Sequence, residues 1–291
     1  MTLFQSIILG FVQGATEFLP VSSSGHLAIF KYLFGLSDVG IAYDILLHVG
    51  TLLAVFAIYY KDIWQLIVNA VCMLAILIKN FFAFLGNFRR VKKKYQYQKI
   101  ITTPYRKFVA LIIVSIIPVG LVGFLLGDWI ESISAGLLVP GICLLITGAA
   151  LYLSEKLPEG TKTAKNLTYK NALIIGAAQA CAAFPGISRS GSTICASLAV
   201  GMKRTFAVKY SFIMSIPVIL GAALKSLKDL SGTEISGGEI GVSLIGMVVA
   251  AVVGFIAIKL LLLVVKNNKF RYFAFYCFAV GLLAIIGSFC I

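Results

Sequence analysis

The sequence contains six long apolar runs, and each has enough residues to cross a lipid bilayer as a helix. A spanning helix needs about 20 predominantly apolar residues. Charged residues make up only 12% of the chain and its mean hydropathy is +0.99, so it lacks the polar surface of a water-soluble globule. The sequence therefore predicts an all-α integral membrane protein with one membrane domain over residues 1–291. The expected spans are residues 41–60, 108–126, 135–153, 208–228, 241–265 and 272–290.

Three further apolar segments are too short, or too often interrupted by polar residues, to be assigned as membrane spans. Residues 3–16 and 172–184 would reach only about 20 Å as helices, and each runs into a cluster of Pro, Gly and Ser. We expect both to form re-entrant helical hairpins. Residues 63–86 are interrupted by Asn69, Lys79 and Asn80, and we expect an interfacial or partly inserted helix there, with a full span as the open alternative.

An internal repeat relates the two halves of the chain at an ungapped offset of 166 residues. Eight of 28 aligned positions are identical, whereas about two are expected from this composition. We expect a duplicated unit of one hairpin plus three spans, covering residues 1–153 and 172–291. The identities in the first copy are Ile8, Gly10, Gln13, Phe18, Ser22, Ser24, Gly25 and Gly35.

The charges bear on how these copies are oriented in the membrane. Residues 87–107 hold eight of the 25 Lys and Arg residues and no acid, which is typical of a cytoplasmic loop. Residues 154–171 and 266–271 then lie on the same side, again with a Lys/Arg excess. Three spans separate the hairpins and place them on opposite sides, as in an inverted repeat. If residues 63–86 span fully, there are seven crossings and both hairpins face inward.

The same basic loop explains the net charge of +14. Charge gathered in one loop reports membrane topology, and no pattern of interleaved aromatic residues for base stacking accompanies it. We therefore expect membrane lipids and no nucleic acid as partners.

The first polar loop, which follows residues 3–16, gathers acid–base and nucleophilic groups. Gln13 and Glu17 share one helix face at a spacing of four residues, and Pro20 then ends the helix. The hydroxyls of Ser22–Ser24 and the imidazole of His26 follow within six residues. A carboxylate inside a membrane is costly and indicates a function. A polar cluster for helix packing is the alternative, but packing does not explain Glu17 together with His26.

The second polar loop, Phe184–Thr193, has the character of an anion-binding loop. Arg189 lies among glycines and hydroxyls, so backbone N–H groups and a guanidinium can bind phosphate oxygens. We expect a half-helix to begin near Thr193 and to add its positive N-terminal dipole. Arg189 reaching a lipid headgroup is the alternative, and its place between small residues argues against it. Together the two loops supply the parts of a phosphoryl-transfer site, and a carboxylate facing a diphosphate also points to Mg²⁺ or Ca²⁺.

Three motifs resemble those of a known family. The Gln13-x-x-x-Glu17 element, the run PVSSSGH at residues 20–26 and the run PGISRSGST at residues 185–193 resemble the paired motifs of bacitracin-resistance type undecaprenyl-diphosphate phosphatases. The resemblance covers essentially the whole chain. It implies hydrolysis of undecaprenyl diphosphate to the monophosphate, which recycles the lipid carrier for cell-wall synthesis, and use of a divalent cation. It also implies a multi-pass protein of the bacterial plasma membrane with an outward-facing site.

Residue roles follow from the resemblance, motif by motif. Ser23 would be the nucleophile and His26 its acid–base partner, while the choice among the three serines, and direct attack by His26 or by water, stay open. Glu17 would hold the metal or the diphosphate, and Gln13 would be a neutral metal ligand. Ser22, Ser24 and Asp44 would form a second layer, with His48 given less weight than Asp44. The phosphate-binding residues would be Ser188, Arg189, Ser190, Gly191 and Thr193.

Two rival functions can be compared with the sequence. Type-2 phosphatidic acid phosphatases also have a P-S-G-H element, but they need a second histidine after an S-R pair. This chain has only His26 and His48, both before Ser188 and Arg189, so that class is excluded. A polyprenyl-phosphate flippase would use the same anion-binding loops without a nucleophile and stays as the alternative. The sequence leaves open whether the protein forms a homodimer.

Overall fold

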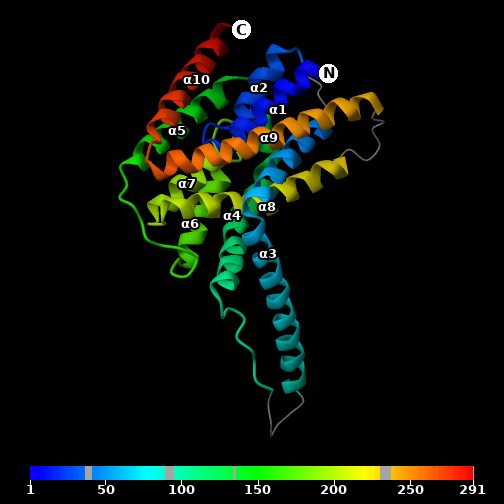
Figure 1. The fold of residues 1–291 in the computed structure, drawn as a ribbon, viewed down its shortest axis with the longest axis vertical. Coiled ribbons are helices and arrows are strands. Elements are labelled where there is room, and N and C mark those ends of the chain that lie inside the picture. The colour runs from blue at the N-terminus through cyan, green and yellow to red at the C-terminus, as the bar shows by residue number, and fades with distance from the viewer. Residues whose placement is uncertain (37–40, 89–94, 134–135, 230–236, 291) are drawn as a thin grey trace.

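The computed structural model describes residues 1–36, 41–88, 95–133, 136–229 and 237–290, and this part of the chain folds into ten α-helices (Figure 1). In chain order the helices are α1 Leu3–Phe18, α2 Ser23–Leu33, α3 Ile41–Phe88, α4 Pro104–Ile133, α5 Leu138–Glu155, α6 Tyr169–Cys181, α7 Arg189–Ala199, α8 Arg204–Asp229, α9 Gly237–Lys266 and α10 Arg271–Cys290.

Six of these helices are long and apolar enough to cross a membrane. They are α3, α4, α5, α8, α9 and α10, which confirms the all-α membrane fold and the six expected spans. Large apolar side chains are exposed along them, for example Phe124, Leu224 and Phe289. Such residues suit a lipid environment, and they explain why the chain is apolar outside as well as inside.

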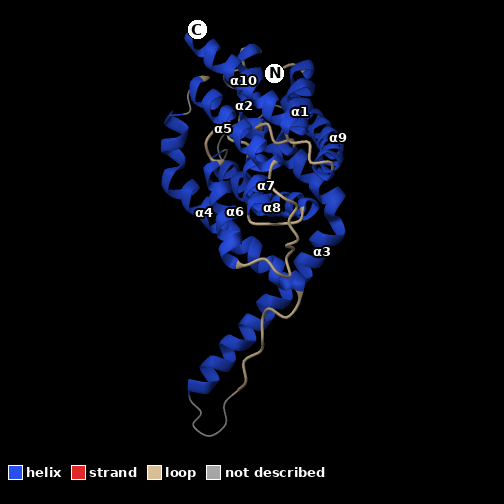
Figure 2. Cartoon of the chain, turned by 90° about the vertical axis from the view of Figure 1, so that its left-hand side faces the viewer, coloured by secondary structure: helices blue, strands red, loops and turns tan. Residues whose placement is uncertain are grey.

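Helix α3 consists of two helical parts. Residues 63–86 are helical, as expected, and they follow the span that begins at Ile41 across a non-helical residue. The helix is kinked at Tyr59, where φ is −108° and ψ is 21°. Beyond this kink α3 leaves the body of the molecule as a stalk, which Figures 1 and 2 show from two directions.

The two polar loops interrupt two short helical hairpins, α1–α2 and α6–α7. Helices α2 and α7 have 11 residues each, and their first residues, Ser23 and Arg189, are 166 positions apart. The expectation that a half-helix begins near Thr193 is wrong, because α7 already begins at Arg189. The Ser188 hydroxyl accepts a hydrogen bond from the backbone N–H of Gly191 at 3.0 Å and caps α7. The helix therefore starts four residues before the expected Thr193.

The tips of the two hairpins touch through positions that the repeat relates. A side chain at Gly25 would meet the backbone of Gly186, and one at Gly191 would meet Pro20. Adding the offset of 166 turns Gly25 into Gly191 and Pro20 into Gly186. The two tips therefore approach each other through the same contact used twice, which supports the predicted duplication.

Each hairpin packs chiefly against a helix of the other half: α1 lies on α9, and α6 lies on α4. Glycine permits both close approaches. A Cβ at Gly10 would collide with the backbone of Gly246, and one at its repeat partner Gly176 would collide with the backbone of Ser115. The two halves of the chain are thus interlocked. The direction in which each hairpin opens relative to the membrane stays a prediction.

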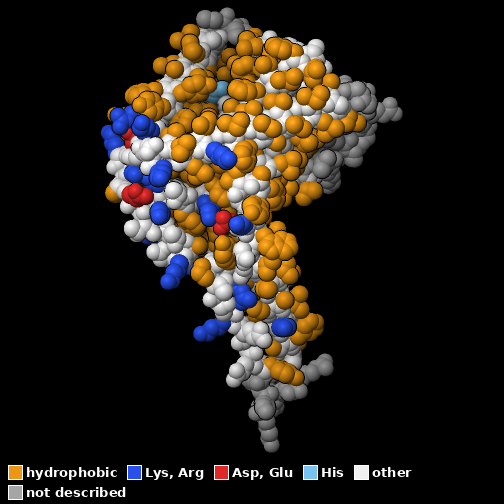
Figure 3. Space-filling model, viewed as in Figure 1, with side chains coloured by type: hydrophobic (Ala, Val, Ile, Leu, Met, Phe, Trp, Pro, Cys, Tyr) orange, Lys and Arg blue, Asp and Glu red, His pale blue; other side chains and the backbone are white. Residues whose placement is uncertain are grey.

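One end of the body gathers Lys and Arg side chains, seen at the left edge of Figure 3. Lys162 and Met202 form a short bridge that ties the end of α7 to the loop before α6. At the same end Arg271 pairs with Glu155 at 2.6 Å and Arg204 with Glu159 at 3.6 Å. This basic end is the side that the charge pattern assigns to the cytoplasm.

Candidate active site

The two polar loops meet where the hairpin tips touch. Arg189 Nη2, at the start of α7, donates to Glu17 Oε1, near the end of α1, across 172 residues of sequence. Glu17 is 7% exposed, so this ion pair lies inside the protein. Repeat-related breaks in two hairpins thus bring the acidic loop and the basic loop into direct contact.

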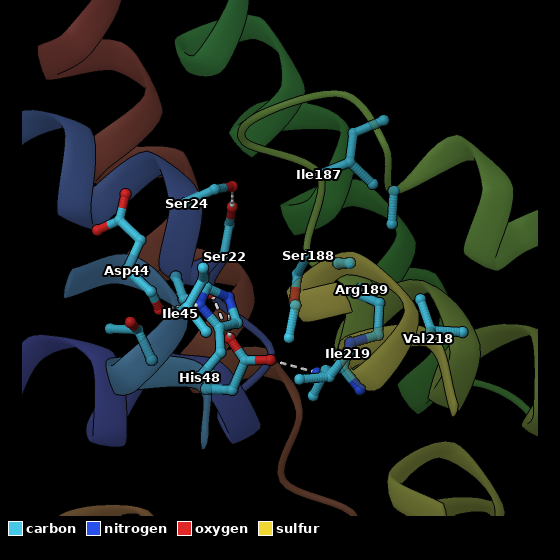
Figure 4. A pocket seen from close by; sticks show the side chains of 16 residues that line it. Ser22, Ser24, Asp44, Ile45, His48, Ile187, Ser188, Arg189, Val218 and Ile219 are labelled. Atoms are coloured by element: carbon cyan, nitrogen blue, oxygen red, sulfur yellow. Dashed lines mark hydrogen bonds and ion pairs between the residues drawn. The ribbon is translucent and has the colours of Figure 1, made fainter. Parts of the chain in front are cut away.

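A cavity of about 380 Å³ opens beside this ion pair (Figure 4). One part of its wall is polar and comes from the hairpins and the first turns of α3; it includes Glu17, Ser23 and Arg189. The remaining wall is apolar. Its residues are Ile45, Ala182, Ile187, Val218, Ile219, Ala222 and Ala223, of which the last four come from α8.

Glu17 is the centre of the polar wall. Ser23 Oγ donates to Glu17 Oε2 at 2.6 Å, and Gln13 Nε2 donates to the same oxygen at 3.2 Å. His48 Nε2 lies 4.0 Å from Glu17 Oε2. The carboxylate is therefore held by Arg189 on one side and faces a serine hydroxyl on the other, which suits it to accept the proton of that hydroxyl.

The start of α2 is open to an anion. Ser22 precedes the helix with φ of 70°, a left-handed conformation that is uncommon outside glycine, and its side chain does not cap the first turn. Its hydroxyl pairs instead with that of Ser24 at 3.3 Å. The backbone N–H groups at the start of α2 thus keep their capacity to bind phosphate oxygens, beside the Ser23 hydroxyl.

Arg189 also retains a free donor. Its Nη2 is used on Glu17, whereas its Nη1 is buried and has no hydrogen-bond partner within the described part of the chain. A buried guanidinium donor left unpaired is costly, and a phosphate oxygen in the cavity would satisfy it.

His26 lies apart from the Ser23 hydroxyl. Its Nδ1 is 2.8 Å from the backbone oxygen of Ser22, and its Nε2 is 2.7 Å from the hydroxyl of Tyr276 on α10. The His26 and Tyr276 rings are also stacked, with centroids 5.6 Å apart. Both ring nitrogens are engaged, so this geometry does not pair His26 with Ser23, and its acid–base role stays a prediction.

The expected phosphate-binding residues divide into two groups. Ser188 lines the cavity together with Arg189, although its hydroxyl caps α7. Ser190 Oγ lies 3.2 Å from Ser188 Oγ and donates to the Leu19 carbonyl at 3.3 Å. Thr193 Oγ1 is fully buried against Ser211 Oγ at 2.6 Å. Ser190, Gly191 and Thr193 therefore shape the loop from behind the cavity wall.

Asp44 and His48 both line the cavity. Asp44 pairs with Lys31 at 2.6 Å, which joins α3 to α2. His48 Nδ1 lies 2.8 Å from the Asp44 carbonyl; since a carbonyl only accepts, Nδ1 carries a proton and Nε2 points towards Glu17. The sequence ranked Asp44 above His48, whereas in the structure His48 lies 4.0 Å from Glu17 and Asp44 pairs with Lys31.

The oxygen atoms near Glu17 show whether the site could bind a divalent cation. Gln13 Oε1 is buried without a hydrogen-bond partner in the described residues, while Nε2 of the same side chain donates to Glu17 Oε2. No group of three or more His, Cys, Asp or Glu residues able to hold a metal occurs in the part of the chain that the structure describes. One carboxylate and one amide oxygen fit Mg²⁺ or Ca²⁺ only where substrate phosphates and water complete the coordination.

Six membrane-length helices around a buried carboxylate, serine and arginine define a multi-pass membrane protein with a site for an anionic group. A sequence model of the family described as "Bacitracin resistance protein BacA" matches residues 6–283. The chain belongs to this family.

Curated relatives extend over almost the whole chain. A protein of Methanosphaera stadtmanae is 42% identical over 288 residues, covering 99% of both chains. One of Treponema denticola is 44% identical over 283 residues, covering 97% of this chain and 96% of the relative, and one of Halothermothrix orenii is 41% identical, covering 98% of both. All three are named undecaprenyl-diphosphatase.

Proposed function

We propose that this protein hydrolyses undecaprenyl diphosphate to undecaprenyl phosphate and inorganic phosphate. Membership of the BacA family and relatives named undecaprenyl-diphosphatase at about 40% identity support the reaction. The product would be the lipid carrier used again in cell-wall synthesis, and the family description links this activity to bacitracin resistance.

One observation carries the proposal: the cavity has one polar wall and one apolar wall. Glu17, Ser23 and Arg189 face a stripe of α8 formed by Val218, Ile219, Ala222 and Ala223. A water-soluble phosphate ester has no apolar chain to pack against the apolar wall. A polyprenyl diphosphate fits both, because its diphosphate needs the polar groups and its first isoprene units need the apolar stripe.

The geometry supports a two-step reaction on Ser23. Its Oγ forms a bond to the terminal phosphorus while the bond from that phosphorus to the bridging oxygen breaks, and undecaprenyl phosphate leaves with the electron pair. Glu17, 2.6 Å from Ser23 Oγ, takes the hydroxyl proton. A water molecule then attacks the phosphorus of the phosphoserine, the bond from this phosphorus to Ser23 Oγ breaks, and Oγ takes back the proton held by Glu17 while phosphate leaves.

Charge on the transferred phosphoryl group would be stabilised by groups already in place. Arg189 Nη1 is an unpaired donor, and the first turns of α2 and α7 both begin at the cavity. Their N–H groups and dipoles favour an anion there. Glu17 and Gln13 would hold a divalent cation, which supplies charge neutralisation for the diphosphate when bound.

The location of the site is part of the proposal. Six membrane-length helices make this a multi-pass membrane protein. We place it in the plasma membrane with the cavity opening outward, on the side opposite the basic end of the molecule.

Phosphate release from a C55 diphosphate by the purified protein tests the proposal. We expect release with Mg²⁺ or Ca²⁺ and its loss on addition of a chelator. Glu17→Gln and Arg189→Lys should each abolish release, while Arg204→Lys, at the distant basic end, should preserve it. The assigned role of Glu17 fails if Glu17→Gln releases phosphate as fast as the parent, and the hydrolase assignment itself fails if the parent releases none with either cation.

A polyprenyl-phosphate flippase is the second candidate, because broken hairpins that face a cavity also occur in secondary carriers. Purified protein that moved undecaprenyl phosphate across vesicles but released no phosphate with either cation would favour the carrier. The hydrogen bond from Ser23 Oγ to Glu17 argues for hydrolysis, since a carrier needs no activated hydroxyl.

A further inference from the structure

The second half of α3, residues 60–88 and here called the arm, has two unlike faces. Asn69, Asn80 and Asn87 lie 11 and 7 residues apart, and 100° per residue places them on one stripe of the helix. The opposite stripe carries Trp64, Val71, Ile78 and Leu85 at seven-residue intervals, all of them exposed. The arm is therefore amphipathic along its length.

Residues 95–103, here called the return segment, cover the asparagine stripe. Asn80 Oδ1 accepts from the Gln98 N–H at 2.8 Å, and Asn80 Nδ2 donates to the Gln98 carbonyl at 2.9 Å. Asn87 binds the N–H and the carbonyl of Tyr95 in the same way, at 2.6 and 3.0 Å. Thr103 Oγ1 donates to Asn69 at 3.2 Å. The asparagines thus act as docking points for an extended chain.

This arrangement does not suit a transmembrane position. The return segment is non-helical, and nearly all of its residues, among them Lys99, are exposed. Irregular backbone survives at hydrocarbon depth only when it is buried in protein or lines a wet cavity. An arm that crossed the bilayer would carry this exposed segment into the lipid.

Water does not suit the arm either. Its outer face exposes a continuous series of large apolar side chains, and an apolar surface of this extent in water would be covered by a partner or a membrane. The exposed residues are Trp64, Ile67, Val68, Val71, Leu74, Leu77, Ile78, Phe81, Phe82, Phe84, Leu85 and Phe88.

Charge identifies the surface that covers it. Residues 60–107 contain ten Lys or Arg residues and one acid, Asp62, which pairs with Lys209 at 2.9 Å, and Lys79 and Lys99 are exposed. In Figure 3 the stalk is hydrophobic along its right edge and carries its Lys and Arg side chains mainly towards the left, the side of the basic end of the body. In Figure 1 it runs across the direction of α8 and α9. An amphipathic helix with a basic polar side fits the surface of a membrane with anionic headgroups.

We propose that the arm lies in the membrane–water interface on the basic side of the protein. Its apolar stripe is immersed in lipid, and its asparagine stripe with the return segment faces water and anionic headgroups. The kink at Tyr59 turns α3 from a crossing direction into the membrane plane. Residues 63–86 then make no crossing of their own, which leaves three crossings between the two hairpins.

Tryptophan fluorescence in vesicles tests this position. The chain has two tryptophans, Trp64 and Trp129, so both are replaced by Phe and one new tryptophan is added. Val71→Trp reports the apolar stripe and Gln98→Trp the return segment. The vesicles contain phosphatidylcholine and phosphatidylglycerol, some with brominated acyl chains, and iodide is the aqueous quencher. We expect brominated lipid to quench the first variant and iodide the second.

Three results would overturn the proposal. Quenching of both variants by iodide would place the arm in water, and quenching of both by deeply brominated lipid would make it a seventh crossing. Protection of Val71→Trp from both quenchers would mean that protein covers the apolar stripe. The single variant Trp129→Phe, which keeps only the native Trp64, repeats the test without a new residue on the arm, and we expect brominated lipid to quench it.

Discussion

At the scale of single residues, the site depends on how two copies of one loop have diverged. The offset of 166 aligns Glu17 with Ala183 and Ser23 with Arg189. Only one copy carries the acid and the hydroxyl, and only the other carries the guanidinium. Because the tips meet through repeated contacts, this divergence places opposite charges on the two sides of one contact.

The hydrogen bond to Glu17 is the reason for proposing Ser23 as the nucleophile among three adjacent serines. Ser23→Ala should lower kcat for phosphate release by about 10³-fold or more, because it removes both the attacking oxygen and the proton that Glu17 accepts. Ser24→Ala should cost much less, since the Ser24 hydroxyl is hydrogen-bonded to Ser22 and not to Glu17 in the described part of the chain. Ser288→Ala, in α10, is the distant control. Equal losses for Ser23→Ala and Ser24→Ala would contradict the assignment.

His26 makes a structural contribution that can be measured separately from catalysis. It binds and stacks on Tyr276, so it ties α2 to α10. His26→Ala and Tyr276→Phe should each lower the free energy of unfolding, by about 1–2 kcal/mol. Combined in one protein they should cost less than the sum, with a coupling of about 1 kcal/mol. Additive losses in chemical denaturation would show that the pair does not act together.

The residue types of the site were predictable from the sequence, but the contacts between their side chains were predictable only in part. Glu17 and Arg189 stand out because charge inside a membrane needs a reason. Nothing in the order of residues reveals that Ser23 lies nearer to Glu17 than His26 does, since this depends on the backbone turn at Ser22. The apolar wall on α8 carried no signal, because Val, Ile and Ala also face lipid throughout the chain.

At the scale of helices, close crossings hold the hairpins in place. The crossing of α6 over α4 depends on Gly176, because a Cβ there would enter the backbone of Ser115. This crossing positions the hairpin that carries Arg189. A substitution at Gly176 should therefore displace Arg189 although Gly176 is not itself a cavity residue.

Gly176→Ala should therefore destabilise the protein by about 1–3 kcal/mol through overpacking and should raise KM for the diphosphate. Gly120→Ala is the matched control in α4, since no heavy atom lies within 4 Å of its Cβ position. The control should be neutral or slightly stabilising, as expected for glycine replaced within a helix. Thermal unfolding and kinetics of both variants decide the matter, and equal behaviour would refute the close-crossing argument.

The apolar stripe of α8 makes a separate prediction about the lipid chain. Ala222→Phe would fill the part of the cavity where the first isoprene units are proposed to lie, so KM for a C55 diphosphate should rise about 10-fold or more. Leu220→Phe, at an exposed position of the same helix outside the cavity lining, should leave KM unchanged. An unchanged KM for Ala222→Phe would place the lipid chain elsewhere.

Helix boundaries show where sequence patterns lose information. The apolar runs predicted the six spans because lipid demands length and apolarity. A helix over residues 63–86 was predicted, but whether it spans was left open, since a polar residue such as Asn69 looks the same whether it limits a span or docks a return segment. The start of α7 was placed too late, because Ser188, Ser190 and Ser192 are all of a residue type that caps helices and the sequence alone does not select Ser188.

At the scale of the whole molecule, the interlocked halves bear on topology. Matching contacts at Gly25 with Gly186 and at Gly191 with Pro20 support two copies of one unit around a shared site. An arm that makes no crossing leaves α3, α4 and α5 as three crossings between the hairpins. Because the number of crossings is odd, the second copy has the opposite orientation in the membrane, so the two hairpins would open to opposite sides.

Labelling of single cysteines in intact cells measures this inversion. Tyr32, near the end of α2, is 59% exposed, and Lys203, just after α7, lies beside Lys162 at the basic end. In a background without the native cysteines, Tyr32→Cys should react with an impermeant maleimide added outside, and Lys203→Cys should react only after the membrane is opened. The positive-inside rule fixes this sign, because the loop that holds Lys203 belongs to the Lys/Arg-rich side. Labelling of neither position before the membrane is opened would mean that both hairpins face inward, and the outward-facing site would fall with the inversion.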